Sequence, residues 1–110
     1  MKKELIVELL QKFEEACYVY QGIECWSARE LQLILGYNKW ENFVKVIDKA
    51  KLSCENSGAM VADHFPDIRK MIELAKGAQR QVVDYALTRY ACYLIAQNGD
   101  ASAFRRLYHE

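Results

Sequence analysis

The sequence predicts an α+β fold that is mostly helical, and three observations support this class. Apolar residues recur at steps of three and four over most of the chain, which is the spacing of helices with one buried side. One proline and five glycines leave room for long regular elements. Lys76-Gly77 interrupts the segment 71–87, which therefore resembles two strands joined by a turn. We expect a helix, a helix-turn-helix-like pair, a β-hairpin and a C-terminal helix.

The first half of the chain contains three predicted helices and a short strand. An apolar stripe predicts a helix over about residues 2–20, which stops near Gln21-Gly22 because Gly22 can adopt a left-handed conformation. Residues 23–26 alternate briefly, as in a short strand. Ser27 and Glu30 then form a capping-box pattern for a short helix. Asn38 and Glu41 repeat that pattern, which predicts Asn38 as the N-cap of a helix over residues 39–55.

The second half is less regular at its start. Residues 59–66 are the least regular stretch, and Pro66 restricts the preceding residue to extended geometry, so no helix continues through the proline. We interpret residues 71–75 and 79–87 as the two arms of a hairpin, although residues 68–75 also fit a helical period. Thr88 is placed to cap a helix that ends at Asn98-Gly99. A last short helix over residues 101–110 has only two apolar anchors, Phe104 and Leu107.

Length and composition limit the class of protein. A chain of 110 residues fits a single domain, 1–110, with one hydrophobic core, and an apolar fraction of 52% excludes disorder throughout. Fifteen basic residues balance fifteen acidic ones, which excludes a globally basic nucleic-acid binder but not a local basic face. No stretch is apolar for long enough to span a membrane. The N-terminal residues do not resemble a secretory signal, so we expect a cytoplasmic protein.

The four cysteines suggest packing rather than chemistry. None of them forms a C-x-x-C pair, and Cys17, Cys54 and Cys92 fall on apolar helical faces, where we expect buried, reduced thiols. The two histidines do not cluster with them, so no structural zinc is predicted. We expect no metal and no cofactor.

Two groups of residues are candidates for nucleic-acid binding. The helix pair within residues 28–55 resembles a helix-turn-helix, whose second helix contacts base edges. The exposed residues of that helix would be Lys39, Asn42, Lys45 and Lys49. A second group, near the predicted hairpin, would contact phosphates as a wing does, and consists of Arg69, Lys70, Lys76, Arg80 and Arg89. Both groups are also compatible with an ordinary solvated surface.

Catalysis has weaker support. Asp63-His64 and Asp67 place a histidine near carboxylates, but no motif supplies a nucleophile for it to activate. The chain also lacks a glycine-rich phosphate-binding loop. We therefore expect a protein that is not an enzyme.

Several runs of residues are similar to a known family. They include the runs 26–32, 39–43 and 63–67, the run 77–80, and the long run 89–100, Arg-Tyr-Ala-Cys-Tyr-Leu-Ile-Ala-Gln-Asn-Gly-Asp. They resemble the start of the DNA-damage-inducible protein D family, which is related to the BRO N-terminal domain and to phage antirepressors. The resemblance extends over about Phe13 to Asp100. It implies a BRO-N-like α+β domain of bacterial or prophage origin, with a role in DNA binding or in regulation linked to the SOS response.

Two departures from the family accompany the resemblance. The family's proteins continue into a second domain that is absent here, and the segment after Asp100 differs from the family's Lys-Pro-containing helix. The chain thus resembles a truncated homologue or a fragment. The first hypothesis is a DNA-binding regulatory module without enzymatic activity. The alternative is an interaction module that acts on a DNA-processing protein without contacting DNA itself.

Overall fold

The computed structural model describes residues 2–99, with side chains from residue 7 onward, and confirms the α+β fold. Its elements in order are α1 (Lys2–Ala16), β1 (Tyr18–Tyr20), β2 (Ile23–Ser27), α2 (Ala28–Ile34), α3 (Trp40–Asn56), α4 (Val61–His64), β3 (Asp67–Glu73), a 3₁₀ turn (Ala75–Gly77), β4 (Gln79–Thr88) and α5 (Arg89–Asn98). No helix among the described residues is both long enough and apolar enough to cross a membrane.

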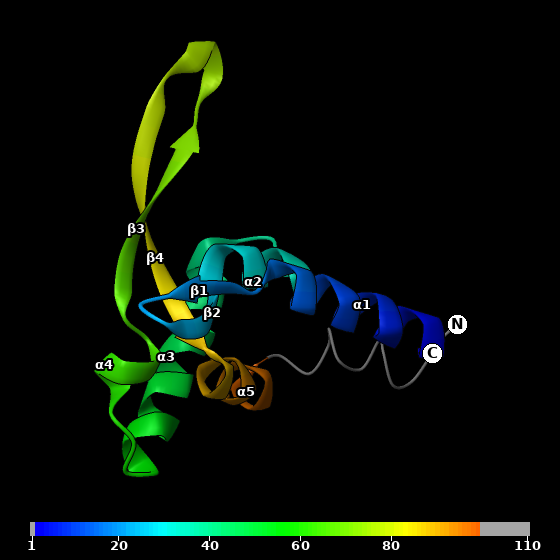
Figure 1. Cartoon of the computed structure of the whole chain (residues 1–110), viewed down its shortest axis with the longest axis vertical. Helices are drawn as coiled ribbons and strands as arrows, with labels where there is room; N and C mark the ends of the chain where they lie inside the picture. The colour runs from blue at the N-terminus through cyan, green and yellow to red at the C-terminus, as the bar shows by residue number, and fades with distance from the viewer. Residues whose placement is uncertain (1, 100–110) are drawn as a thin grey trace.

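The four strands form one antiparallel sheet in the order β1-β2-β4-β3. β4 has ten residues, and only its last three, Ala86–Thr88, pair with β2. β3 pairs with the remaining part of β4, from Asp67↔Tyr85 to Glu73↔Gln79, where β4 has no pairing with β2. The outer part of this hairpin is therefore a two-stranded arm. Figure 1 shows the arm projecting away from the helices at the top of the view, whereas α3 runs toward the bottom.

The core lies where the sheet meets α3 and α5. Its largest fully buried side chains include Trp26, Phe43, Ile47, Leu87 and Ile95. Trp26 also anchors α1, because its Nε1 donates a 2.7 Å hydrogen bond to the carbonyl of Phe13 and the two rings stack at 4.4 Å. Burial of large apolar and aromatic side chains supplies most of the driving force for folding.

The first predicted helix is shorter than the apolar stripe suggests. It ends at Ala16, and Tyr18–Tyr20 form β1 instead. The run Tyr-Val-Tyr favours a strand, and the turn that follows has positive φ at both Gln21 (50°) and Gly22 (80°). Two such residues match the right-handed twist of a tight hairpin. The stripe predicted the helix correctly but placed its end four residues too late.

The predicted caps were partly correct. Ser27 caps α2, since its Oγ accepts from the amide of Glu30 at 3.4 Å, but the Glu30 carboxylate pairs with Lys70 rather than reaching back. Thr88 caps α5 by accepting from the amide of Ala91 at 3.2 Å. The prediction for Asn38 was wrong, because α3 begins at Trp40. Its N-cap is Lys39, which makes no side-chain capping bond. The connection between α2 and α3 therefore spans residues 35–39.

The hairpin was predicted correctly, with different limits. β3 begins at Asp67 and ends at Glu73, so Leu74-Ala75 belong to the turn. The irregular stretch before Pro66 contains the one-turn helix α4. The predicted short helix over residues 101–110 lies outside the described residues.

The four cysteines are free thiols. Cys54 and Cys92 are buried as predicted, but Cys17 is only half-buried, and Cys25, which was not expected in the core, is 2% exposed. Cys17 follows the end of α1, so the helical face on which it was placed no longer exists there. Burial raises the pKa of Cys25 and Cys54, and it raises that of Cys92 to about 12. These thiols are therefore poor nucleophiles at neutral pH.

Candidate nucleic-acid interface

The β3–β4 arm carries four of the nine candidate binding residues, and its register decides which face each one occupies. Lys70 lies opposite Val82 and Arg80 lies opposite Ile72, so the two cations are diagonal neighbours on one face. Arg69 is on the other face, since side chains alternate along a strand. Lys76 occupies the turn. The positive charge is thus distributed around the arm and its tip.

The tip is a tight loop with two consecutive residues in the left-handed region. The amide of Leu74 donates a 2.7 Å hydrogen bond to the carbonyl of Ala78, which closes the loop. Lys76 has φ 63° and Gly77 has φ 77°. A side chain in this region costs about 1–2 kcal/mol, so the lysine is held here against its conformational preference. Strain of this kind is concentrated at functional sites in proteins.

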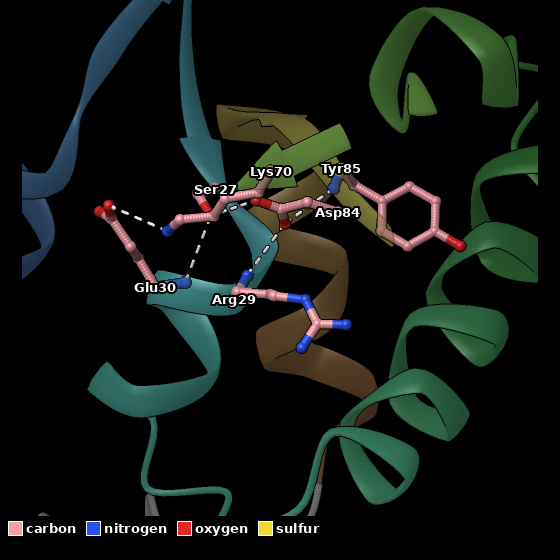
Figure 2. Close-up of polar contacts among 6 residues, drawn as sticks. All are labelled: Ser27, Arg29, Glu30, Lys70, Asp84 and Tyr85. Carbon is pink, nitrogen blue, oxygen red and sulfur yellow. Dashed lines mark hydrogen bonds and ion pairs between the residues drawn. The ribbon is translucent and has the colours of Figure 1, made fainter. Parts of the chain in front are cut away.

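The base of the arm is fixed by a buried carboxylate. Asp84 is fully buried in β4, and Figure 2 shows it between Ser27 and the backbone of Tyr85. Its Oδ2 accepts from the Ser27 hydroxyl at 2.6 Å, and its Oδ1 accepts from the amides of Arg29 at 3.1 Å and Tyr85 at 2.8 Å. The arm is therefore hydrogen-bonded to the N-terminus of α2, where an anion is also favoured by the helix dipole.

A second set of contacts joins the arm to α2 and α3. The Arg29 Nε donates a 2.7 Å hydrogen bond to the carbonyl of Val83, and its guanidinium lies 4.1 Å from the centre of the Trp40 ring. Lys70 pairs with Glu30 at 3.6 Å (Figure 2). Sequence patterns did not single out Asp84 or Arg29. A lone acid inside the otherwise apolar run 82–87 was the available signal for Asp84, because a buried carboxylate needs several hydrogen-bond donors.

The candidate residues of the second helix form a separate group. Asn42, Lys45 and Lys49 are exposed on α3, and Lys39 is exposed just before it. Trp40, Phe43 and Ile47 face inward. Figure 1 shows α3 running away from the tip of the arm. The structure thus places the hairpin cations on one arm, on both of its faces and at its tip, and leaves the α3 residues as a separate group.

Arg89 differs from the other candidates because it is already paired. Its guanidinium contacts Glu14 at 3.4 Å and Glu24 at 3.3 Å, and it lies 4.8 Å from the Trp26 ring centre. Hydrogen bonding to Glu24 raises the pKa of Arg89. These contacts connect α1, β2 and the start of α5, so the residue has a structural role whatever else it binds.

The histidine considered for catalysis lies in an open cleft of about 670 Å³ between the β1–β2 hairpin, α4 and α5. Its Nδ1 is 2.7 Å from the Thr88 hydroxyl, and its ring meets the edge of Tyr90. These contacts hold the ring against the body, and the Thr88 hydroxyl beside it also accepts from the amide of Ala91 as the cap of α5. Among the described residues, no group of three or more His, Cys, Asp or Glu side chains is arranged to hold a metal ion.

An apolar groove of about 340 Å³ lies between α1, α2 and α5. Leu9, Leu10 and Phe13 form one wall, and Cys92, Tyr93 and Ala96 form another. Leu10 and Tyr93 are 57% exposed, which is high for large apolar side chains. Surfaces of this kind are common where proteins bind the helices of partners.

Comparison with known proteins gives one family and one relative. Residues 15–110 match the family described as "BRO family, N-terminal domain". DNA damage-inducible protein D of Escherichia coli (strain K12) is 46% identical over 91 residues, which cover 82% of this chain and 33% of the relative. The chain thus spans about a third of that protein's length. No solved structure matches the chain. The match over nearly all of its residues shows that this chain belongs to the BRO family, through its N-terminal domain.

Proposed function

We propose that this domain is a non-enzymatic, DNA-binding regulatory module of the bacterial DNA-damage response or of prophage regulation, and that it contacts DNA chiefly with the β3–β4 arm. The observation that carries the proposal is the charge of the arm. Between residues 69 and 81, four cations accompany a single carboxylate, that of Glu73. The rest of the chain must then be net acidic, because the total charge is zero.

This distribution suits phosphate contacts. The arm cations surround a two-stranded ribbon, a shape that fits a DNA groove with phosphates on both sides. The name of the E. coli relative associates it with DNA damage, which supports the same context for this domain. Binding through phosphates alone is independent of sequence, so we expect weak discrimination among duplexes.

The proposal can be tested by the salt dependence of binding to a short duplex. About four to six phosphate contacts give a slope of roughly −4 to −5 for log affinity against log salt. Changing Arg69 and Arg80 to Gln should weaken binding and reduce the slope by about 2, since each lost contact removes about 0.9. The matched control is the double change of Lys45 and Lys49 to Gln on α3. Absence of wild-type binding at low salt would reject the proposal.

The apolar groove favours a second candidate function, an interaction module for a DNA-processing protein. Its occupant would be an amphipathic helix of that protein, inserted between α1 and α5. Leu10→Glu would place a charge in the groove and should abolish binding of such a partner while leaving the arm intact. If Leu10→Glu abolished binding to DNA and not binding to a partner helix, this second function would be rejected.

A further inference from the structure

The tip of the arm is apolar, although the rest of the arm is charged. Residues 74–78 are Leu-Ala-Lys-Gly-Ala, so Lys76 is the only polar side chain in the loop. Leu74 is 44% exposed, and Met71 on the shaft is 52% exposed. A large apolar side chain at the end of a cationic ribbon is poorly suited to water and well suited to the stacked bases beneath a phosphate backbone.

The arm is long enough to place this leucine at the floor of a groove. Lys70 is the last residue of β3 that is tied to the body, through its ion pair with Glu30. Leu74 lies four residues further, which is about 13 Å at the rise of a β-strand. The grooves of B-DNA are only about 7.5–8.5 Å deep. Lys70 can thus remain near the phosphates while Leu74 reaches the bases.

The arm is also held firmly enough to press on DNA. Asp84, Ser27 and Arg29 join its base to α2 by three hydrogen bonds, of which one is buried, one is partly buried and one is exposed. Separating two stacked bases with an inserted side chain costs free energy. A hairpin that moved freely at its base would bend aside instead of separating the bases. The described contacts oppose that bending at the point where the arm leaves the sheet.

We propose that the arm enters the minor groove of duplex DNA and that Leu74 inserts at a base step, so that the domain binds kinked DNA in preference to straight DNA. This inference rests on the proposed DNA-binding function. The minor groove is favoured because Leu74, Ala75 and Ala78 carry no side-chain group that could read the hydrogen-bonding pattern of the major groove. Known minor-groove binders combine an apolar wedge with Arg, Lys, Asn or Gln, and Gln79, Arg80 and Gln81 flank this one.

The test compares two duplexes of equal length that carry fluorophores at both ends. One is fully matched, and the other has a two-base mismatch at its centre, which lowers the cost of unstacking. The wild-type chain should bind the mismatched duplex about tenfold more tightly and bring the fluorophores closer together in both complexes. Netropsin, which occupies the minor groove, should displace it.

The critical variant is Leu74→Ala, with Leu33→Ala on α2 as the matched control, since Leu33 is 73% exposed and lies outside the arm. Leu74→Ala should abolish both the bending and the preference for the mismatched duplex, yet bind matched DNA within about twofold of wild type, because the phosphate contacts remain. Leu33→Ala should behave as wild type.

The outcomes separate the two proposals. Binding without bending, a preference that survives Leu74→Ala, or binding that netropsin does not affect would overturn the wedge but leave the DNA-binding function in place. No binding to either duplex at low salt would overturn both. Equal melting temperatures of the two variants and the wild type would show that each comparison is made on a folded domain.

Discussion

The hydroxyl of Ser27 lies 2.6 Å from a carboxylate oxygen of Asp84, a residue 57 positions further along the chain. The same hydroxyl oxygen accepts from the amide of Glu30, so one side chain both caps α2 and holds the base of the arm. The N-terminus of a seven-residue helix and the middle of β4 are thereby parts of one polar cluster inside the core.

Removing the carboxylate should destabilise the whole domain. Asp84→Ala leaves three donors, the Ser27 hydroxyl and the amides of Arg29 and Tyr85, without their acceptor in a buried site. We expect a loss of about 3 kcal/mol in the free energy of unfolding, measured by urea denaturation. Asp84→Asn keeps one acceptor oxygen and should cost about 1 kcal/mol. Equal losses for the two variants would contradict this account of the cluster.

Ser27 and Asp84 should also be energetically coupled. Ser27→Ala alone removes a cap and a buried partner, at about 1–2 kcal/mol. In the double variant, the second change should cost less than it does alone, with a coupling energy of about 1 kcal/mol or more. Thr88→Ala, which removes the cap of α5, is the control for the cycle. Additive effects of Ser27→Ala and Asp84→Ala would show that the hydrogen bond contributes little to stability.

The buried thiol of Cys92 should make stability fall at high pH. Its pKa is about 12 in the folded chain against 9.0 for an ordinary thiol. Below pH 9 both states keep the proton, so the contribution is fully present there. Between pH 9 and 12 the unfolded state binds fewer protons than the folded state, and stability decreases as pH rises. By pH 10 the loss should be about 1 kcal/mol.

The control for this pH dependence is Cys92→Ala, which should reduce the slope between pH 8.5 and 10 even though it lowers stability at pH 7. Cys25 and Cys54, whose pKa values are also raised by burial, contribute to the slope that remains. Chemical denaturation at each pH measures both effects. Tyr18, whose pKa burial also raises to about 12, contributes a similar trend and should account for part of the slope that remains. A slope identical to that of the wild type would contradict the assignment to Cys92.

Replacing Arg89 should affect the stability of α1 rather than the affinity for DNA. Its ion pairs with Glu14 and Glu24 are exposed, so Arg89→Ala should lower the stability of the domain only slightly, including the loss of the contact with the Trp26 ring. We expect faster amide hydrogen exchange in α1, since Glu14 is the residue through which Arg89 contacts that helix.

DNA affinity distinguishes this role from a binding role. Arg89→Ala should leave the affinity for a short duplex within about twofold, whereas Arg80→Ala on the arm should reduce both the affinity and the salt slope by about one phosphate contact. The opposite pattern would place Arg89 in the binding surface.

Most of the helices, and the hairpin, could be predicted because their signals are local. Ser27 and Thr88 cap helices whose apolar faces start immediately after them, and Lys76-Gly77 supplies the turn that divides two strands. The end of α1 could not be placed, because the stripe continues through Tyr18 and Tyr20 while pairing with β2 decides their conformation. Asn38 failed as a cap for a similar reason: packing of Trp40 against Arg29 and Phe43 accompanies the start of α3.

The candidate site was predicted as a set of residue types and not as an arrangement. The cations of the hairpin were recognised from their density in the sequence, but register alone separates Arg69 from Lys70 and Arg80. The pairing of Arg89 with Glu14 and Glu24 joins residues 75 and 65 positions apart, which periodicity does not reveal. Asp84 was overlooked because its partners come from a different part of the chain.

The continuity of β4 has a mechanical consequence. One unbroken strand forms half of the exposed ribbon at its first residues and the centre of the sheet at its last, with Asp84 between the two parts. The Ser27–Asp84 hydrogen bond therefore holds the ribbon at its base, at the point where β4 leaves the sheet. The contacts of Asp84 lead from the base of the ribbon to the N-terminus of α2, and Arg29 continues them to Trp40 on α3. A molecule that displaces the tip would thus act on a chain of contacts that ends at α3, without touching α3 itself.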